Sequence, residues 1–229
     1  MAKKQDGTEG KIIAVEEALG KTEQFIEKNQ KIIIIVLGTI MALVLGYFGV
    51  KQFYIKPQET KAHAEMFYAE KYFELDSLDL ALNGDGEHIG FLEVIDNYGI
   101  TKASNLAKYY TGIIYLKKGK YDEAITYLKK FNGDDQIVGA IATASIGDAY
   151  MEMNNLDEAL KYYLQAADQN INNFSSPQCL MKAGFVYEEK ADWANALKIY
   201  EKIKKEFYKS QESREIDKYI AKAKGMLNQ

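Results

Sequence analysis

The sequence predicts an all-α protein in which a single N-terminal transmembrane helix precedes an α-solenoid of helical hairpins that ends in a capping helix. Two observations predict this fold class. Residues 32–50 form an uncharged apolar stretch that is close to the length needed to cross a bilayer. In the C-terminal part, a pattern of small and aromatic residues occurs three times, at spacings of 35 and 37 residues. Periods of this length are typical of helical repeat arrays.

Length and charge set the first limits. The chain has 229 residues, which is enough for one ordinary domain with attachments. Residues 57–229 contain 21 Lys and Arg against 27 Asp and Glu, a formal charge of −6. An acidic domain repels phosphate backbones, so we expect no nucleic-acid partner. The one cysteine, Cys179, cannot form an internal disulfide, a CxxC motif or a zinc tetrad, and it leaves the compartment open.

Residues 1–31 form a short N-terminal segment, expected to be cytoplasmic, with six lysines and six acidic residues. Ile12, Val15 and Leu19 recur at helical spacing. We expect a short helix on the solvent side that leads into the membrane. Its mixed charge does not match the basic face that anionic lipids favour.

Residues 32–55 are expected to be the membrane anchor. Twelve residues of Ile32–Val50 are Ile, Leu, Val or Phe, and together they favour insertion by roughly 4 to 7 kcal/mol before polar terms. Tyr47, Phe53 and Tyr54 lie where interfacial aromatic residues belong. A buried core helix would need a large surrounding domain, and a cleaved signal peptide would need an A-x-A site, which does not follow the stretch.

Gly38, Ala42 and Gly46 recur every four residues along this helix. Such a small-residue face lets two membrane helices approach closely, so these residues are candidates for packing against a partner span. The simpler alternative is that Gly and Ala are common in membrane helices. The three nearest lysines before the span are Lys21, Lys28 and Lys31, and the three nearest after it are Lys51, Lys56 and Lys61, so the positive-inside count does not decide its orientation.

Residues 56–104 are expected to form a degenerate first helical hairpin. His63–Leu80 and Phe91–Tyr98 are its predicted helices, and the Gly-rich residues 81–90 form the loop between them. The loop superficially resembles a calcium-binding loop, but no register supplies the acidic residues, Gly and Glu that an EF-hand requires. Thr101, and Ser210 later in the chain, are expected to cap the helices that follow them.

Residues 105–208 contain the three repeats, which align on a glycine of the first helix in each hairpin. The aligned sets are Gly112, Gly147 and Gly184; Tyr115, Tyr150 and Tyr187; Tyr121, Leu156 and Trp193; Ala124, Ala159 and Ala196; and Leu128, Tyr163 and Tyr200. This pattern resembles the tetratricopeptide repeat, a helix–turn–helix unit of 34 residues. Glycine and alanine are small at these places because two antiparallel helices touch there.

Turn and cap residues predict the helix boundaries within the repeats. Gly119 and Asn154 are placed in the tight turns. Asn155 with Glu158 resembles a capping box, and Ser176 with Pro177 predicts an N-cap and a first helical position. Residues 209–229 are expected to form the capping helix, from about Glu212 to Leu227, whose polar outer face suits the open end of a solenoid.

No residue set predicts an enzyme. The two histidines, His63 and His88, are not in a metal-binding arrangement, and no nucleophile elbow, P-loop or dinucleotide-binding motif occurs. We therefore expect no catalytic residues, no cofactor, no metal and no small-molecule substrate.

The resemblance to tetratricopeptide repeats implies a concave groove lined by the first helix of each repeat. The groove positions are Leu106, Tyr109, Ile113 and Leu116; Ile141, Ala144, Asp148 and Met151; and Gln178, Met181, Phe185 and Glu188. The set lacks the Lys, Arg and Asn residues that grip acidic chaperone tails. An apolar groove that contains methionine suits a partner helix or an unfolded apolar segment. The alternative is that the groove is filled by the chain's own helices, including the last one.

The complete layout resembles the YfgM-type ancillary subunit of the SecYEG translocon. A charged N-terminus leads through Phe25-x-x-x-Asn29 into one span, and a degenerate hairpin and tetratricopeptide repeats follow. Residues 80–86 (LALNGDG) and 101–110 (TKASNLAKYY) are also similar to tetratricopeptide proteins of Bacteroidetes. The resemblance implies a bacterial inner-membrane protein with periplasmic repeats, which binds SecYEG and a periplasmic chaperone of the PpiD type, or emerging polypeptides.

A second class of function remains open from the sequence. The same architecture is compatible with a structural adaptor in another cell-envelope complex, such as outer-membrane assembly or a signalling scaffold.

Overall fold

The computed structural model describes the backbone of residues 7–133, 135 and 137–228, and side chains within this range from residue 26 onward. Helices and no strands occur among the described residues, and they include a helical repeat array, so the all-α prediction is confirmed. The chain divides into two compact units, Met1–Pro57 and Gln58–Gln229.

The first unit consists of α1 (Gly7–Val50) and the π-helical segment Lys51–Ile55. One helical stretch, Ile26–Glu74, is long and apolar enough to cross a membrane, with a mean hydropathy of 2.5 and none of its most apolar part buried. Gly38, Ala42 and Gly46 are exposed on α1, and packing through this face stays a prediction. The apolar stripe Ile12–Leu19 lies outside the described side chains.

The first hairpin of the second unit differs from its prediction. It contains α2 (Lys56–Glu74), α3 (Leu78–Asn83) and α4 (Phe91–Asn97). The predicted helix His63–Leu80 is wrong at its end, because Asp76 has a φ of 55° and ends α2. The predicted loop also begins too early, since residues 81–83 belong to α3.

The Gly-rich loop between α3 and α4 is organised around Asp85. Gly84 and Gly86 have φ values of 82° and 92°, which favour glycine. The Asp85 carboxylate accepts hydrogen bonds from the Tyr72 hydroxyl at 2.6 Å and from the His88 and Glu87 N–H groups at 2.7 and 2.9 Å. These bonds, led by that of Tyr72, lower the pKa of Asp85 to about 2. The Asp85 carboxylate therefore stabilises the conformation of the loop through hydrogen bonds within the chain.

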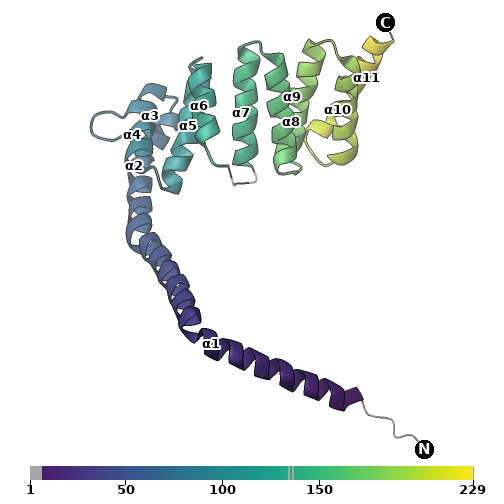
Figure 1. Ribbon diagram of the computed structural model, residues 1–229. Coiled ribbons are helices and arrows are strands. Elements are labelled where there is room, and N and C mark those ends of the chain that lie inside the picture. Colours follow the sequence, from purple (N-terminus) through teal and green to yellow (C-terminus); the bar gives the residue numbers. More distant parts are fainter. Residues whose placement is uncertain (1–6, 134, 136, 229) are drawn as a thin grey trace, which may run out of the picture. The chain divides into compact units, whose positions relative to one another are not determined.

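The three repeats form hairpins of adjacent helices, followed by a short 3₁₀ turn and a last helix. They are α5 (Lys102–Lys117) with α6 (Tyr121–Lys130), α7 (Val138–Glu152) with α8 (Leu156–Gln169), and α9 (Ser175–Glu189) with α10 (Trp193–Glu206), then Glu212–Arg214 and α11 (Ile216–Leu227). Figure 1 shows α5 to α11 lying side by side as one array. Gly119 and Asn154, as predicted, and also Ala191 take positive φ values in the turns within the hairpins.

The caps are confirmed at two helices and corrected at two others. The Thr101 hydroxyl accepts from the Ser104 N–H at 3.0 Å, and the Asn155 side chain accepts from the Glu158 N–H at 3.3 Å. Ser210 accepts from the Ser213 N–H, but it caps the 3₁₀ turn that precedes α11 rather than one continuous helix. The predicted cap at Ser176 is wrong.

The helix α9 begins at Ser175, so Pro177 lies in its first turn but not at its first position. The side chain of Asn172 accepts hydrogen bonds from the N–H groups of Phe174 and Ser175, each at 2.8 Å. Asn172 thus accepts from the backbone N–H groups at the start of α9, two residues or more before the predicted first position at Pro177.

The two helices of each hairpin lie in close contact at the aligned glycines. A Cβ atom added at Gly184 would lie 2.4 Å from the Tyr200 ring, and one added at Gly147 would lie 2.7 Å from the Tyr163 ring. At Gly112 the corresponding distance to the Leu128 side chain is 2.6 Å. These contacts explain why the repeats align on glycine.

The core runs through the second unit as three successive clusters of buried side chains. The first joins α2, α3, α4 and α5, the second joins α6 and α7, and the third joins α7 to α11. Ile216 and Ala223 of α11 are fully buried in the third cluster. The last helix therefore closes the array, as a capping helix should.

We expect Gly184→Ala to destabilise the protein by about 1–3 kcal/mol, because the buried Tyr200 ring has no room to move away from the new methyl group. The free energy of unfolding is measured by urea denaturation of the full chain in detergent, with far-ultraviolet circular dichroism as the signal.

Gly225→Ala is the matched control. Nothing lies within 4 Å of a Cβ atom at this position of α11, so we expect a gain of up to about 1 kcal/mol from helix propensity. Equal effects of the two substitutions would contradict the close-contact explanation.

Candidate protein-binding surface

The structure places the predicted groove residues on α5, α7 and α9, the first helices of the three repeats. Phe185 is 41% exposed and Met181 is only 9% exposed. The half-buried residues are Leu106, Tyr109, Ile113, Leu116, Asp148, Met151 and Glu188. By the side chains and clefts that they contact, the groove residues fall into three groups.

The first group lines an open cleft of about 680 Å³. Three of the predicted groove residues, Leu116 of α5 and Asp148 and Met151 of α7, line this cleft together. The remaining lining residues, which sequence reasoning did not assign to the groove, are Lys117, Lys118, Gly119, Tyr121, Glu152, Tyr163 and Lys182. The cleft thus combines two apolar groove side chains with a polar surround.

Asp148 is held by two partners from the helices that follow. The Tyr163 hydroxyl of α8 donates to its carboxylate at 2.7 Å, and the Lys182 Nζ of α9 lies 2.6 Å from the same oxygen. Burial, and then the negative charge of Asp148, raise the pKa of Tyr163 well above its ordinary value. The charge of Asp148 is therefore balanced by Lys182 of the same domain. This ion pair also connects the second repeat to the third.

The same arrangement recurs one repeat later. The Tyr200 hydroxyl of α10 donates to Glu188 of α9 at 3.0 Å, and the Lys222 Nζ of α11 lies 2.6 Å from the other carboxylate oxygen. Burial and the Glu188 charge also raise the pKa of Tyr200. We call each Tyr–acid–Lys set a clamp, defined as Tyr163–Asp148–Lys182 and Tyr200–Glu188–Lys222.

The second group packs between repeats. Tyr109 and Ile113 lie against the cluster of buried side chains shared by α6 and α7, and the Tyr109 ring is 5.6 Å from that of Phe131. Burial raises the pKa of Tyr109. Leu106 lines a separate cleft with Phe131 and the loop before α5.

The third group lies against the last helix. The Tyr219 ring of α11 is 5.6 Å from that of Phe185, Lys222 pairs with Glu188, and Tyr219 lines a small cleft together with Met181. At the third repeat, the chain's own helix therefore contacts the predicted groove residues.

Among the residues that the structure describes, no group of three or more His, Cys, Asp or Glu side chains is placed to hold a metal ion. Cys179 of α9 is buried beside the first clamp. Its burial, with a smaller contribution from Asp148, raises the pKa of the thiol to about 11 against the lowering effect of Lys182.

Comparison with known families agrees with the repeat geometry. Tetratricopeptide-repeat models match residues 106–133, 144–170 and 178–210. These ranges fall on the three hairpins α5–α6, α7–α8 and α9–α10. No curated protein matches the chain. Tetratricopeptide repeats indicate a scaffold for protein–protein interaction.

We expect Tyr163→Phe to cost about 1 kcal/mol of unfolding free energy, because Asp148 loses a hydrogen bond while the ring contact at Gly147 remains. Urea unfolding measures the loss. Tyr208→Phe removes a hydroxyl from a 67% exposed side chain and should change nothing. A loss as large for Tyr208→Phe would show that the Tyr163 clamp contributes no specific stability.

We expect the Cys179 thiol to react far more slowly with a disulfide reagent at pH 8 in the folded protein than in urea. The raised pKa leaves little thiolate at this pH, and the side chain is 3% exposed. Because the folded pKa lies above the unfolded one, this group stabilises the fold below about pH 9. That contribution is lost as the pH rises toward 11. Equal reaction rates in the two states would contradict the burial.

Proposed function

We propose that the protein is a single-pass membrane scaffold whose tetratricopeptide repeats bind an apolar segment of a partner protein. The observation that carries the proposal is the open cleft of about 680 Å³, where Leu116 and Met151 of consecutive repeats meet. A partner helix, or an unfolded apolar segment, suits such a surface because methionine adapts its shape to different side chains.

The charges around the cleft support apolar rather than ionic recognition. Asp148 is paired with Lys182, and Lys117 and Lys118 pair with Asp76 and Asp79 of the first hairpin. Charged groups that are already paired add little net attraction for a charged ligand. The partner segment should therefore present apolar side chains to the cleft and keep its own charges at the rim.

The membrane part of the proposal rests on α1. An exposed apolar helix of this length is unfavourable in water and favourable in a bilayer. We assign residues 32–55 to the span, with Gly38, Ala42 and Gly46 facing a partner span. The resemblance to YfgM-type subunits supports an inner-membrane location with periplasmic repeats, and SecYEG and a PpiD-type chaperone as partners.

Photo-cross-linking to a partner protein tests whether the cleft is a binding site. A photoreactive amino acid in place of Met151 should cross-link a partner in cells, because this side chain lines the open cleft. The same amino acid in place of Lys161, an exposed position on α8, is the matched control and should capture much less. Equal capture at both positions would contradict binding in the cleft.

The identity of the captured protein separates the two classes of function. Translocon subunits, a periplasmic chaperone or secreted polypeptides would support a role at the secretion channel. Components of another envelope complex would instead support a structural adaptor. Co-purification of the full chain in mild detergent provides the independent check.

A further inference from the structure

Two asparagine–glycine pairs occur in the chain, Asn83–Gly84 and Asn132–Gly133. Asparagine is thermolabile, because the main-chain nitrogen of the next residue can attack the side-chain amide and close a five-membered ring. Glycine in second place has no Cβ atom to hinder that approach. The reaction is intramolecular, so its rate depends on whether the folded backbone lets the two groups meet.

The pair Asn83–Gly84 is held at the end of α3. The Gly84 N–H donates to the Leu80 carbonyl at 2.8 Å, and the Asn83 side-chain amide donates to the Asp79 carbonyl at 3.0 Å. A Cβ atom at Gly84 would overlap the His88 carbonyl, so the backbone is also closely packed there. Ring closure at Asn83 would therefore require the last turn of α3 to unwind.

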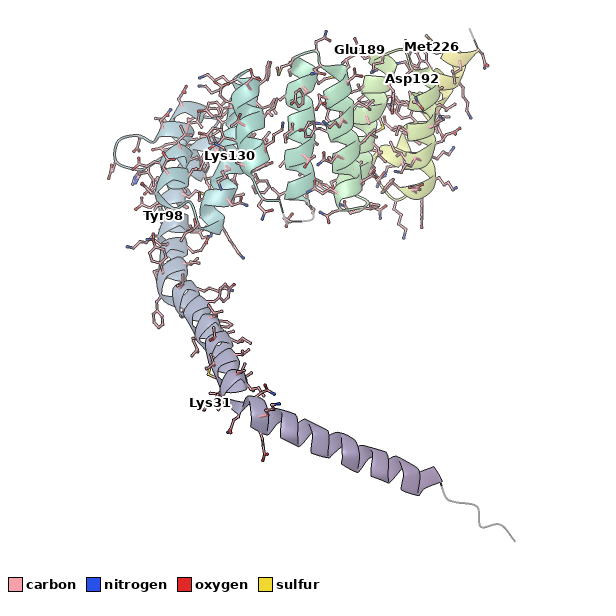
Figure 2. The ribbon with its side chains drawn as sticks, viewed as in Figure 1. Lys31, Tyr98, Lys130, Glu189, Asp192 and Met226 are labelled. Atoms are coloured by element: carbon pink, nitrogen blue, oxygen red, sulfur yellow. The ribbon has the colours of Figure 1, made fainter. Side chains whose placement is uncertain are left out.

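The pair Asn132–Gly133 has different surroundings, because it lies in the loop that joins α6 to α7. Figure 2 labels Lys130, the last residue of α6, directly before this loop. Asn132 is exposed and lies outside the helices. In the part of the chain that the structure describes, the Gly133 N–H donates to no acceptor. The attacking nitrogen is therefore not committed to a helix, in contrast to that of Gly84.

The side chain of Asn105, on α5, restrains the main chain at this pair. Its Nδ2 donates to the Asn132 carbonyl at 2.8 Å, and its Oδ1 accepts from the Asn132 N–H at 2.8 Å. Ring closure requires the main chain at Asn132 to rotate until the Gly133 nitrogen reaches the side-chain Cγ atom. That rotation moves the carbonyl that Asn105 binds, so Asn105 opposes the reaction.

Packing explains why the second residue of this pair is glycine. A Cβ atom at Gly133 would lie 2.5 Å from the Cα atom of Gly139, which is buried on α7. A larger residue would hinder attack by the nitrogen, but it would also push the loop away from α7. The contact between the loop and α7 therefore retains the labile pair.

We propose that Asn132 is a site of spontaneous deamidation and isomerisation in the folded protein, and that Asn83 is protected. The Gly133 nitrogen forms a bond to Cγ of Asn132, and the bond from Cγ to Nδ2 breaks. The departing Nδ2 takes the proton of the Gly133 nitrogen and leaves as ammonia. Water then opens the ring, at Cγ to give aspartate or at the main-chain carbonyl carbon to give isoaspartate.

The products change the junction between the first two repeats. Both carry a new negative charge three residues before the exposed Asp135. In the isoaspartyl product, the main chain runs through Cβ and Cγ and is longer by a methylene group. The added length displaces Gly133 from its close contact with Gly139. Isoaspartate at this position therefore loosens the loop against α7 and destabilises the repeat domain.

Peptide mass spectrometry tests the proposal. The full chain is incubated in detergent at pH 8 and digested, and the asparaginyl, aspartyl and isoaspartyl forms of each peptide are separated and quantified. We expect the peptide with Asn132 to convert several-fold faster than the peptide with Asn83 in the folded protein. In urea the two rates should become similar. Equal rates in the folded protein, or an undiminished difference in urea, would overturn the proposal.

Two variants test the roles of individual residues, and circular dichroism confirms that both are folded. Asn105→Ala leaves the reacting pair intact and should accelerate conversion at Asn132 several-fold without changing it at Asn83. An unchanged rate at Asn132 would overturn the restraint by Asn105. Asn132→Ser keeps the main-chain groups that Asn105 binds but has no side-chain amide. Its urea midpoint should stay constant during incubation while that of the original chain falls, and an equal fall in both would contradict the destabilisation by isoaspartate.

Discussion

The close approach of two helices at Gly112, Gly147 and Gly184 is the contact on which the repeat domain depends. Where the opposing residue is a tyrosine, the ring that fills the space above the glycine also carries a hydroxyl to an acid of the first helix, Asp148 or Glu188. That acid then pairs with a lysine of the helix after the hairpin. A steric requirement within one hairpin therefore determines where a polar connection to the next can form.

The first repeat lacks this connection, and the difference coincides with the open cleft. Leu128 lies against Gly112 and has no hydroxyl to offer an acid. Nearby on α5, the Thr111 hydroxyl is a buried side-chain oxygen without a hydrogen-bond partner among the described residues. The first repeat contacts the second through apolar and aromatic side chains such as Tyr109 and Ile113. The junction of the first two repeats is thus the one that leaves Leu116 and Met151 accessible.

The sequence predicts those parts of the fold that recur in each repeat. The prediction fails where the residue that sets a turn or an ion pair has no counterpart in the other repeats. The aligned glycines, the turns at Gly119 and Asn154 and the cap at Asn155 all follow from periodicity and local propensity. The left-handed Asp76 carries no such signal, because its residue type does not demand that conformation. Ala191 stands seven residues after Gly184, at the repeat position of Gly119 and Asn154, so the repeat itself accounts for its positive φ although alanine does not favour it. Lys182 and Lys222 were missed because they occupy unrelated places, one inside a repeat and one in the last helix.

The coverage of the third repeat by α11 has a consequence for the growth of the array. An uncovered last hairpin would offer its apolar side to the first hairpin of another copy, and head-to-tail contacts of this kind extend into filaments. Here Ile216 and Ala223 fill that side, while Asp217, Lys218 and Lys224 face solvent. An additional hairpin that packs against the third repeat in the same way would therefore have to take the place of α11, because Ile216 and Ala223 already occupy that surface.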